Sequence, residues 1–209
     1  MIYIAAVIAG IVAYLLGSIN SSILVGKLFG VTDIRQHGSG NAGTTNTLRT
    51  IGAKAAALVF VGDILKGVVA VLLARLIAFL LQVDNSIAVL AAAFLVVLGH
   101  NYPLYFGFKG GKGIATSAAV ILMIDPLIGI CVFVFAILVM LITRYVSVGS
   151  IAAAVAFPTA VAIWHHDNIP YLVFAIAIGL LAILRHKENI KRLIKGTESK
   201  LGAKKKENV

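Results

Sequence analysis

The sequence predicts an all-α integral membrane protein, a polytopic bundle of about seven transmembrane helices with its N-terminus outside and its C-terminus in the cytoplasm. Of the 209 residues, 60% are hydrophobic and only 12% are charged, whereas a soluble domain of this length needs more polar surface. Most apolar stretches approach the roughly 20 residues that a helix needs to cross a bilayer. Finally, the basic residues occupy alternate turns between these stretches.

Each apolar stretch predicts one helix, and the stretches cover about 3–27, 54–82, 86–106, 114–124, 127–143, 148–164 and 169–185. The first stretch lacks the basic start and the A-x-A-type site of a cleaved signal peptide, so we interpret it as a retained span. The fourth covers only about half a bilayer. It either begins in the preceding loop or is a buried half-helix. We expect one membrane domain over 1–209, with 187–209 as a basic tail.

The positions of the basic residues predict the orientation. The turns around Asp84, Asp125 and Asp167 contain no lysine or arginine, whereas the intervening turns and the tail do. The positive-inside rule therefore places these basic turns in the cytoplasm. The formal charge of +10 does not favour nucleic acid as a partner, because the bases lie beside spans, where they interact with anionic lipid.

The first of three polar islands lies in the turn after the first stretch and is closed by Arg49. Its residues are small or form hydrogen bonds, and the candidate binding residues among them are Gly38, Ser39, Gly40, Asn41, Gly43, Thr44, Thr45 and Asn46. Glycines let successive N–H groups point into one concavity. A helix that begins near Thr44 would add a partial positive charge. These features favour an anion site over an ordinary flexible loop.

The second island runs directly into the short fourth stretch. It combines two lysines with glycines, and its candidate site residues are Lys109, Gly110, Gly111, Lys112 and Gly113. The order of a Walker A loop is absent. Free backbone amides, two ammonium groups and a following helix N-terminus are nevertheless the parts of an anion cradle. The alternative is a basic turn that only sets topology.

The third island follows the last stretch. His186 and Asn189 are three residues apart and share one face of a helix, while Lys187 and Glu188 point elsewhere. The histidine is a candidate general base or phosphate donor, or only an interfacial residue. Within the second stretch, Asp63 and Lys66 have the spacing of an intramembrane ion pair, with either a structural or a substrate-related role.

The islands are predicted to lie on the cytoplasmic side, where they can converge on one site. They offer lysine, arginine, hydroxyl and amide groups and one histidine, without a carboxylate pair or a metal cluster. Such a site suits phosphate binding and charge neutralisation. A transporter of a phosphorylated anion is the main alternative, but its bases or glycine breaks would lie at mid-membrane or on both sides. A non-catalytic membrane scaffold is a third interpretation.

Three strings in the order GSGNAGTTNTLR, GHNYPLYFGFKGGKG and RHKEN resemble the signature motifs of the bacterial acyl-phosphate:glycerol-3-phosphate acyltransferases, the PlsY family. The resemblance covers nearly the whole chain, including Asp63, Lys66 and the Arg144–Ser147 segment. It implies transfer of a fatty acyl group from acyl phosphate to the 1-hydroxyl of glycerol 3-phosphate. The products would be 1-acylglycerol 3-phosphate (lysophosphatidate) and phosphate, in the phospholipid biosynthesis of a bacterial cell membrane.

The resemblance also implies roles for particular residues, and it implies no cofactor or metal. Ser39 and Arg49 carry over as essential polar groups, and His186 and Asn189 as those of the third motif. The glycines of the second motif carry over as the glycerol 3-phosphate cradle, beside Lys109 and Lys112, with Ser147 as a lesser candidate. Whether His186 or the phosphate of glycerol 3-phosphate accepts the hydroxyl proton stays open, and we favour the phosphate.

Overall fold

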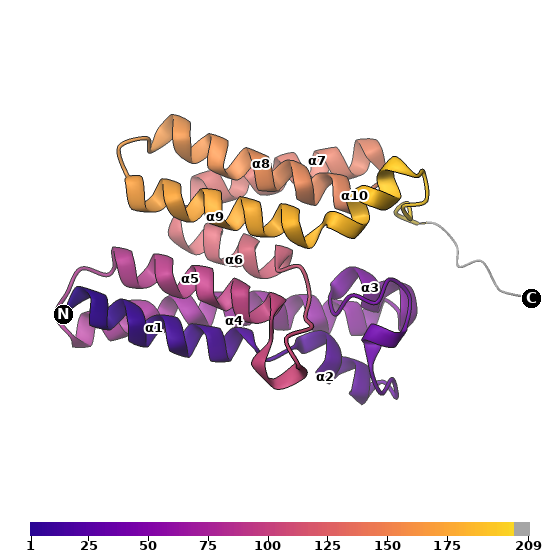
Figure 1. Cartoon of the computed structure of the whole chain (residues 1–209), viewed down its shortest axis with the longest axis horizontal. Coiled ribbons are helices and arrows are strands. Elements are labelled where there is room, and N and C mark those ends of the chain that lie inside the picture. The colour runs from indigo at the N-terminus through magenta and orange to yellow at the C-terminus, as the bar shows by residue number, and fades with distance from the viewer. Residues whose placement is uncertain (203–209) are drawn as a thin grey trace, which may run out of the picture. The chain divides into compact units, whose positions relative to one another are not determined.

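The computed structural model describes residues 1–202, and every regular element in that range is a helix (Figure 1). This confirms the predicted all-α class. The main helices are α1 (Ile2–Gly17), α2 (Ser21–Leu28), α3 (Thr44–Thr50), α4 (Ala53–Leu80), α5 (Ser86–Asn101), α6 (Ile114–Ile124), α7 (Pro126–Thr143), α8 (Val146–Trp164), α9 (Ile169–Arg185) and α10 (Lys187–Ile194). Two short 3₁₀ turns, η1 (Ile34–Gln36) and η2 (Leu104–Phe106), lie in the loops. The chain forms one compact unit from Met1 to Pro126 and a second that begins at Leu127.

Five segments of the described chain are long and apolar enough to cross a membrane, and the bent pair α9–α10 is a sixth candidate. The five are Ile2–Leu28, Ala53–Leu80, Ser86–Phe106, Pro126–Thr143 and Val146–Trp164. The weak fourth stretch of the sequence forms α6, which begins directly after the glycine-rich second island and has only 11 residues. It is therefore a short helix that does not extend back into the loop.

The first span is broken between α1 and α2. Asn20 has an extended backbone, and its side-chain oxygen accepts a hydrogen bond from the amide of Ile23 at 3.1 Å, so it caps the start of α2. The carbonyls of Gly17 and Ile19 at the break accept from the ammonium group of Lys66. A helix break at membrane depth requires such partners, because lipid offers none.

Small residues bring α1 and α5 close together in the first unit. Ala5, Ala9, Ala13 and Gly17 recur every fourth residue on one face of α1, and all are buried. A Cβ at Gly17 would collide with the carbonyl of Val96 on α5. This is the small-xxx-small pattern by which membrane helices approach each other and gain van der Waals contact.

In the second unit, α8 packs against α9. A Cβ at Gly179 on α9 would collide with the carbonyl of Ala154 on α8, which shows how closely the backbones approach. Beside this contact, the rings of Phe157 and Phe174 meet edge to face with centroids 6.1 Å apart. The chain then bends by 54° between α9 and α10, at His186.

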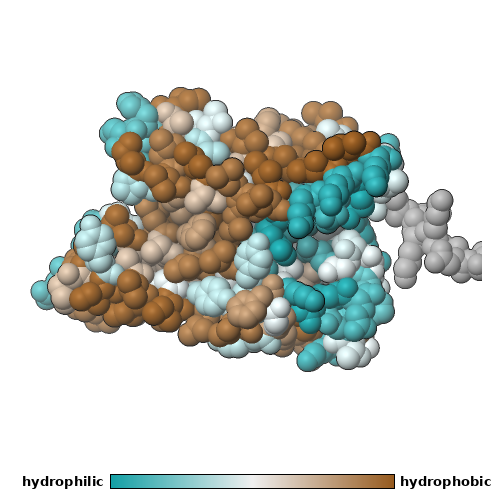
Figure 2. Space-filling view, viewed as in Figure 1, coloured by the Kyte–Doolittle hydropathy of each residue, from teal (hydrophilic) through white to brown (hydrophobic). Residues whose placement is uncertain are grey.

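The outward faces of the long helices are apolar. On α4, for example, Leu58, Leu65 and Leu72 are exposed, while the small Ala70 and Ala74 are buried. In Figure 2 hydrophobic residues cover the visible face of α1, whereas hydrophilic residues gather over α2, α3 and the adjoining loops, and over α10. Large exposed side chains over small buried ones are expected of helices in lipid, because the surrounding solvent is itself apolar.

Candidate active site

Asn46, the last residue of the first island, organises that loop from a buried position. Its side-chain oxygen accepts hydrogen bonds from the amide of Ser39 at 2.8 Å and from the Ser39 hydroxyl at 3.2 Å. Its side-chain nitrogen donates to the carbonyls of Ile34 and His37 at 3.2 and 3.0 Å. A Cβ at Gly38 would collide with the Asn46 oxygen, and Gly38 has φ +60°, so only glycine fits there. Asn46 therefore holds Ser39 in place.

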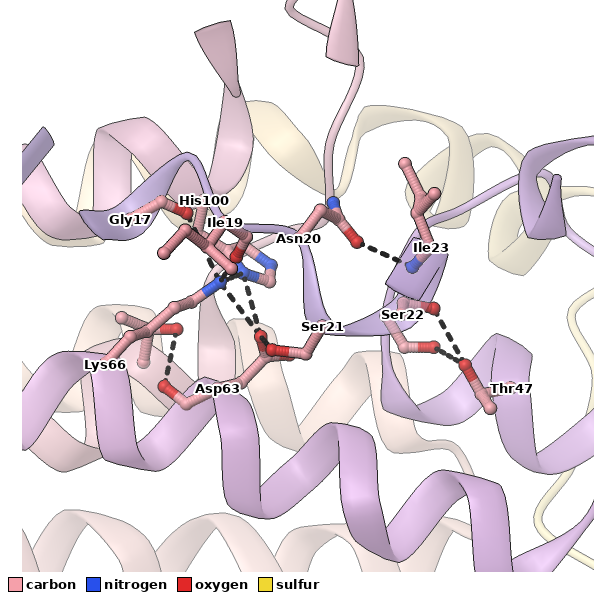
Figure 3. Close-up of polar contacts among 12 residues, drawn as sticks. Gly17, Ile19, Asn20, Ser21, Ser22, Ile23, Thr47, Asp63, Lys66 and His100 are labelled. Atoms are coloured by element: carbon pink, nitrogen blue, oxygen red, sulfur yellow. Dashed lines mark hydrogen bonds and ion pairs between the residues drawn. The ribbon is translucent and has the colours of Figure 1, made fainter. Parts of the chain in front are cut away.

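The helix predicted near Thr44 is present, since α3 begins at that residue. The Thr47 hydroxyl lies 2.8 Å from that of Ser22, which ties α3 to α2 (Figure 3). Ser39 is exposed on the loop, and Arg49 is partly buried in the last turn of α3. Gly40 is exposed in the loop and Asn41 and Gly43 are partly buried there, while Thr44 and Thr45 form the partly buried first turn of α3.

The second island folds back onto the end of α5, which differs from the expected cradle of free amides. The amide of Gly110 donates to the carbonyl of Asn101 at 3.2 Å, and the amide of Gly111 donates to the carbonyl of His100 at 3.1 Å. These two amides therefore complete the C-terminal end of α5. Lys109 is exposed and Lys112 is partly buried.

The first two islands pack together. A Cβ at Gly111 would meet the carbonyl oxygen of Ala42 at 2.7 Å, so the two backbones touch. Beneath them lies a small apolar cluster of Ile23, Ile34 and Ala42, against which Phe106 packs. The structure thus brings the first and second motifs together, as the sequence predicts.

Arg35, a basic residue in the turn after the first apolar stretch, links the same two loops. One terminal nitrogen of its guanidinium donates to the carbonyls of Phe106 at 2.8 Å and Lys109 at 3.1 Å. Asp33 holds the guanidinium through hydrogen bonds to Nε and Nη2 at 2.8–3.1 Å. The side-chain hydrogen bond from Arg35 lowers the pKa of the Asp33 carboxyl below its ordinary value. The Asp-x-Arg spacing in the sequence indicates the Asp33–Arg35 ion pair, but it does not indicate the link to the second loop.

The intramembrane ion pair between Asp63 and Lys66 is confirmed at 2.9 Å and is buried within the first unit (Figure 3). It belongs to a larger cluster, because Nδ1 of His100 lies 2.8 Å from the Lys66 ammonium. The Ser21 hydroxyl donates to the Asp63 carboxylate at 3.0 Å. This cluster therefore joins α4 to the helix break and to the end of α5.

The third motif lies in the second unit. His186 and Asn189 are 2% and 5% exposed, while Lys187 and Glu188 point outward, which confirms the predicted helical face. Nδ1 of His186 lies 2.8 Å from the carbonyl oxygen of Ala182. A carbonyl only accepts hydrogen bonds, so in the neutral ring Nδ1 carries the proton and Nε2 carries the lone pair.

Glu198 gathers the polar side chains around the third motif, and no pattern in the sequence marked it. Its carboxylate accepts hydrogen bonds from Ser147 at 2.9 Å, from Asn189 at 2.7 Å and from Arg192 at 2.7 Å. Burial opposes ionisation, but the three hydrogen bonds outweigh it and lower the pKa of the Glu198 carboxyl. Asn189 and Ser147, both candidate site residues, are thus held by a buried carboxylate.

Among the described residues, no group of three or more His, Cys, Asp or Glu side chains is placed to hold a metal ion. The polar groups are cationic side chains, hydroxyls and amides on loops fixed by buried hydrogen bonds. Fold and loops together define a helical integral membrane protein with two basic, glycine-rich loops packed against each other.

The family follows from comparison with known proteins. Residues 7–196 match the family model described as glycerol-3-phosphate acyltransferase. The chain therefore belongs to the glycerol-3-phosphate acyltransferase family, as its motifs indicate.

Individual relatives agree over nearly the full length. The glycerol-3-phosphate acyltransferase of Thermoanaerobacter pseudethanolicus is 45% identical over 200 residues, which cover 95% of this chain and 97% of the relative. That of Clostridioides difficile is 46% identical over 200 residues, with the same coverage. A crystal structure of PlsY, an integral membrane glycerol 3-phosphate acyltransferase in its glycerol 3-phosphate form, is 40% identical, with a TM-score of 0.85 over 94% of this chain and 96% of that chain. Its lysophosphatidic acid form gives a TM-score of 0.78.

Proposed function

We propose that the protein transfers a fatty acyl group from acyl phosphate to the 1-hydroxyl of glycerol 3-phosphate. The observation that carries this proposal is the packing of the first island on the second, through Ala42 and Gly111. It joins the loop that holds Ser39 to the loop that presents Lys109. The names of the relatives, and the glycerol 3-phosphate and lysophosphatidic acid forms of the solved neighbour, support the same substrate and product.

The chemistry needs little beyond these groups. The 1-hydroxyl oxygen attacks the acyl carbon, the bond from that carbon to the phosphate oxygen breaks, and inorganic phosphate leaves. Acyl phosphate is an activated mixed anhydride, so the protein mainly aligns the reactants and neutralises charge. In this proposal Arg49, Lys109 and Lys112 bind the phosphate groups, and the Ser39 hydroxyl exchanges its hydrogen bond to Asn46 for one to a phosphate oxygen.

We further propose that the third motif also serves this reaction, and that the reaction takes place at the cytoplasmic surface of a bacterial cell membrane. The basic turns that contain the islands support this orientation. Asn189, held by Glu198, and His186, held by Ala182, are fixed side chains suited to position a substrate. Acyl chains would then reach the site laterally from the bilayer.

The hydroxyl proton has two possible acceptors. The lone pair on Nε2 of His186 is one, and the tethered phosphate of glycerol 3-phosphate, with a second pKa of about 6, is the other. We favour the phosphate, because an anhydride donor needs only a weak base. His186 then serves to position a substrate group.

The donor is tested with purified protein, labelled glycerol 3-phosphate and either acyl phosphate or acyl-CoA. We expect labelled lysophosphatidate from acyl phosphate and none from acyl-CoA or acyl carrier protein alone. The two packed loops offer sites for short anionic heads, and nothing in them matches an adenine or a pantetheine arm. Comparable rates with acyl-CoA would refute the choice of donor, and no product from either donor would refute the function.

The base is tested with His186→Gln, which keeps hydrogen bonding but cannot accept the proton. We expect a substantial residual rate, with an ionisation near pH ~6 retained in the rate profile. A loss of more than about a thousandfold in kcat, rescued by added imidazole, would instead make His186 the base.

A further inference from the structure

The buried cluster of Asp63, Lys66 and His100 takes no part in the proposed reaction. All three residues are nearly inaccessible, with exposed fractions of 2%, 5% and 4%. Besides its bonds to the helix break, the Lys66 ammonium lies 2.8 Å from Nδ1 of His100 and 2.9 Å from the Asp63 carboxylate. Ion pairs at membrane depth are costly, so a cluster of this kind calls for a function.

The cluster touches the second island through His100. The carbonyl of His100 accepts a hydrogen bond from the amide of Gly111 at 3.1 Å. The ring of His100 fills the space where a side chain at position 111 would begin, because a Cβ there would collide with Nε2. The same residue thus holds the Gly111 backbone on two sides, through its carbonyl and its ring.

The cluster also fixes the orientation of that ring. Nδ1 of His100 lies 2.8 Å from the Lys66 ammonium and 3.4 Å from the Asp63 carboxylate, so both side chains hold the ring with its Nε2 toward Gly111. The far side of the loop is tied to the same turn of α4, because the Thr116 hydroxyl on α6 donates to the carbonyl of Asp63 at 3.1 Å. The loop is therefore anchored to this turn both before and after its glycines.

We infer that Asp63 and Lys66 are positioning residues, which act through His100 on the Gly110–Gly111 backbone and so on phosphate binding by Lys109 and Lys112. This inference rests on the proposed function. It assigns the intramembrane ion pair to the binding of glycerol 3-phosphate rather than of the acyl donor. The buried charge in α4 is needed because the loop has no side chains of its own at positions 110 and 111 to hold it.

The inference is tested by steady-state kinetics of His100→Ala, Lys66→Met and the double variant. We expect KM for glycerol 3-phosphate to rise about tenfold in each single variant, the equivalent of one lost hydrogen bond. KM for acyl phosphate should stay within about twofold of the wild type. Since Lys66 acts through His100, the double variant should show the same KM as the single variants.

Arg75→Met is the matched control, because Arg75 lies on the same helix, is exposed and donates to the carbonyl of Met123. We expect both KM values to be unchanged in it. If Lys66→Met does not fold, His100→Ala still decides the matter, because it leaves the Asp63–Lys66 ion pair in place.

The outcomes separate this inference from the proposed function. A wild-type protein that forms no lysophosphatidate refutes the function itself. An active wild type whose His100→Ala variant keeps its KM for glycerol 3-phosphate, or loses affinity for both substrates equally, refutes the positioning role alone.

Discussion

At the scale of single residues, the side chains that the sequence marks as binding groups divide into those that face outward and those that hold the loops. Ser39 and Lys109 are exposed, whereas Asn46 and Asn189 are buried and bonded to their own surroundings. The latter two act by fixing their neighbours. The motif alone does not show which residues face a ligand and which hold the loop, because an asparagine side chain can do either.

Asn46→Asp tests the loop-holding role. The aspartate keeps the Oδ1 acceptor for both hydrogen bonds from Ser39 but has no N–H to donate to the carbonyls of Ile34 and His37. We expect the free energy of unfolding to fall by about 1–3 kcal/mol and kcat/KM to fall at least about tenfold, because buried acceptors lose their donors. Thermal unfolding in detergent and steady-state rates provide the two measurements.

The control is the same substitution at Asn168, whose side-chain oxygen caps α9 by accepting from the amide of Tyr171. An aspartate there accepts the same bond, so stability and rate should be unchanged. Equal losses in both variants would contradict the assigned role of Asn46.

Glu198→Gln tests the carboxylate that holds Ser147, Asn189 and Arg192. The amide can accept hydrogen bonds from Ser147 and Asn189 but presents an N–H to Arg192. We therefore expect the free energy of unfolding to fall by about 1–3 kcal/mol at neutral pH. The pKa of Glu198 is lowered on folding, so its ionised form stabilises the protein above its ordinary pKa of 4.5, and this stabilisation is lost as the pH falls through the lower folded value. The difference in melting temperature between wild type and variant should therefore be full at pH ~7 and shrink in acid. A difference independent of pH would contradict the ionised form of Glu198.

At the scale of elements, the second island shows how a glycine can be required for a reason other than its torsion angle. Gly111→Ala places a Cβ against the His100 ring and the Ala42 carbonyl, so one of the two loops must move. We expect KM for glycerol 3-phosphate to rise at least about tenfold while the protein still folds. Steady-state kinetics measure the change.

Gly107 offers the control in the same loop. Its φ is +66° and nothing lies within 4 Å of the place where a Cβ would stand, so Gly107→Asn should be tolerated, since asparagine adopts the left-handed region. A raised KM in this variant as well would indicate general softening of the loop rather than the contact at Gly111.

Much of this scale could be predicted from the sequence. The apolar stretches indicated every long helix and also the short α6. They could do so because the length of an apolar segment and the positions of basic residues are read from the local sequence. The links between elements were not predictable. Arg35 reaches a carbonyl 71 residues away and Glu198 reaches Ser147 over 51 residues, and no local pattern encodes such partners.

At the scale of the whole molecule, the remaining prediction is the orientation. Single cysteines at Asp84 and Lys109, both exposed, should react with an impermeant thiol reagent from opposite sides of the membrane. The native Cys131 is exposed and must first be replaced by alanine. Reaction of both cysteines from one side would overturn both the orientation and the cytoplasmic site.

The broken first span has a consequence for biosynthesis. The carbonyls of Gly17 and Ile19 at the break depend on Lys66, which the ribosome adds 49 and 47 residues later. Until then a nascent chain in the bilayer has no partner for a broken segment, and an unpaired backbone group costs several kcal/mol there. The early chain is therefore most stable as one continuous helix through Ser18–Asn20, with the i→i−4 ladder intact. We therefore expect the first segment to enter the membrane as one continuous helix and to break between α1 and α2 only when α4 packs beside it during assembly.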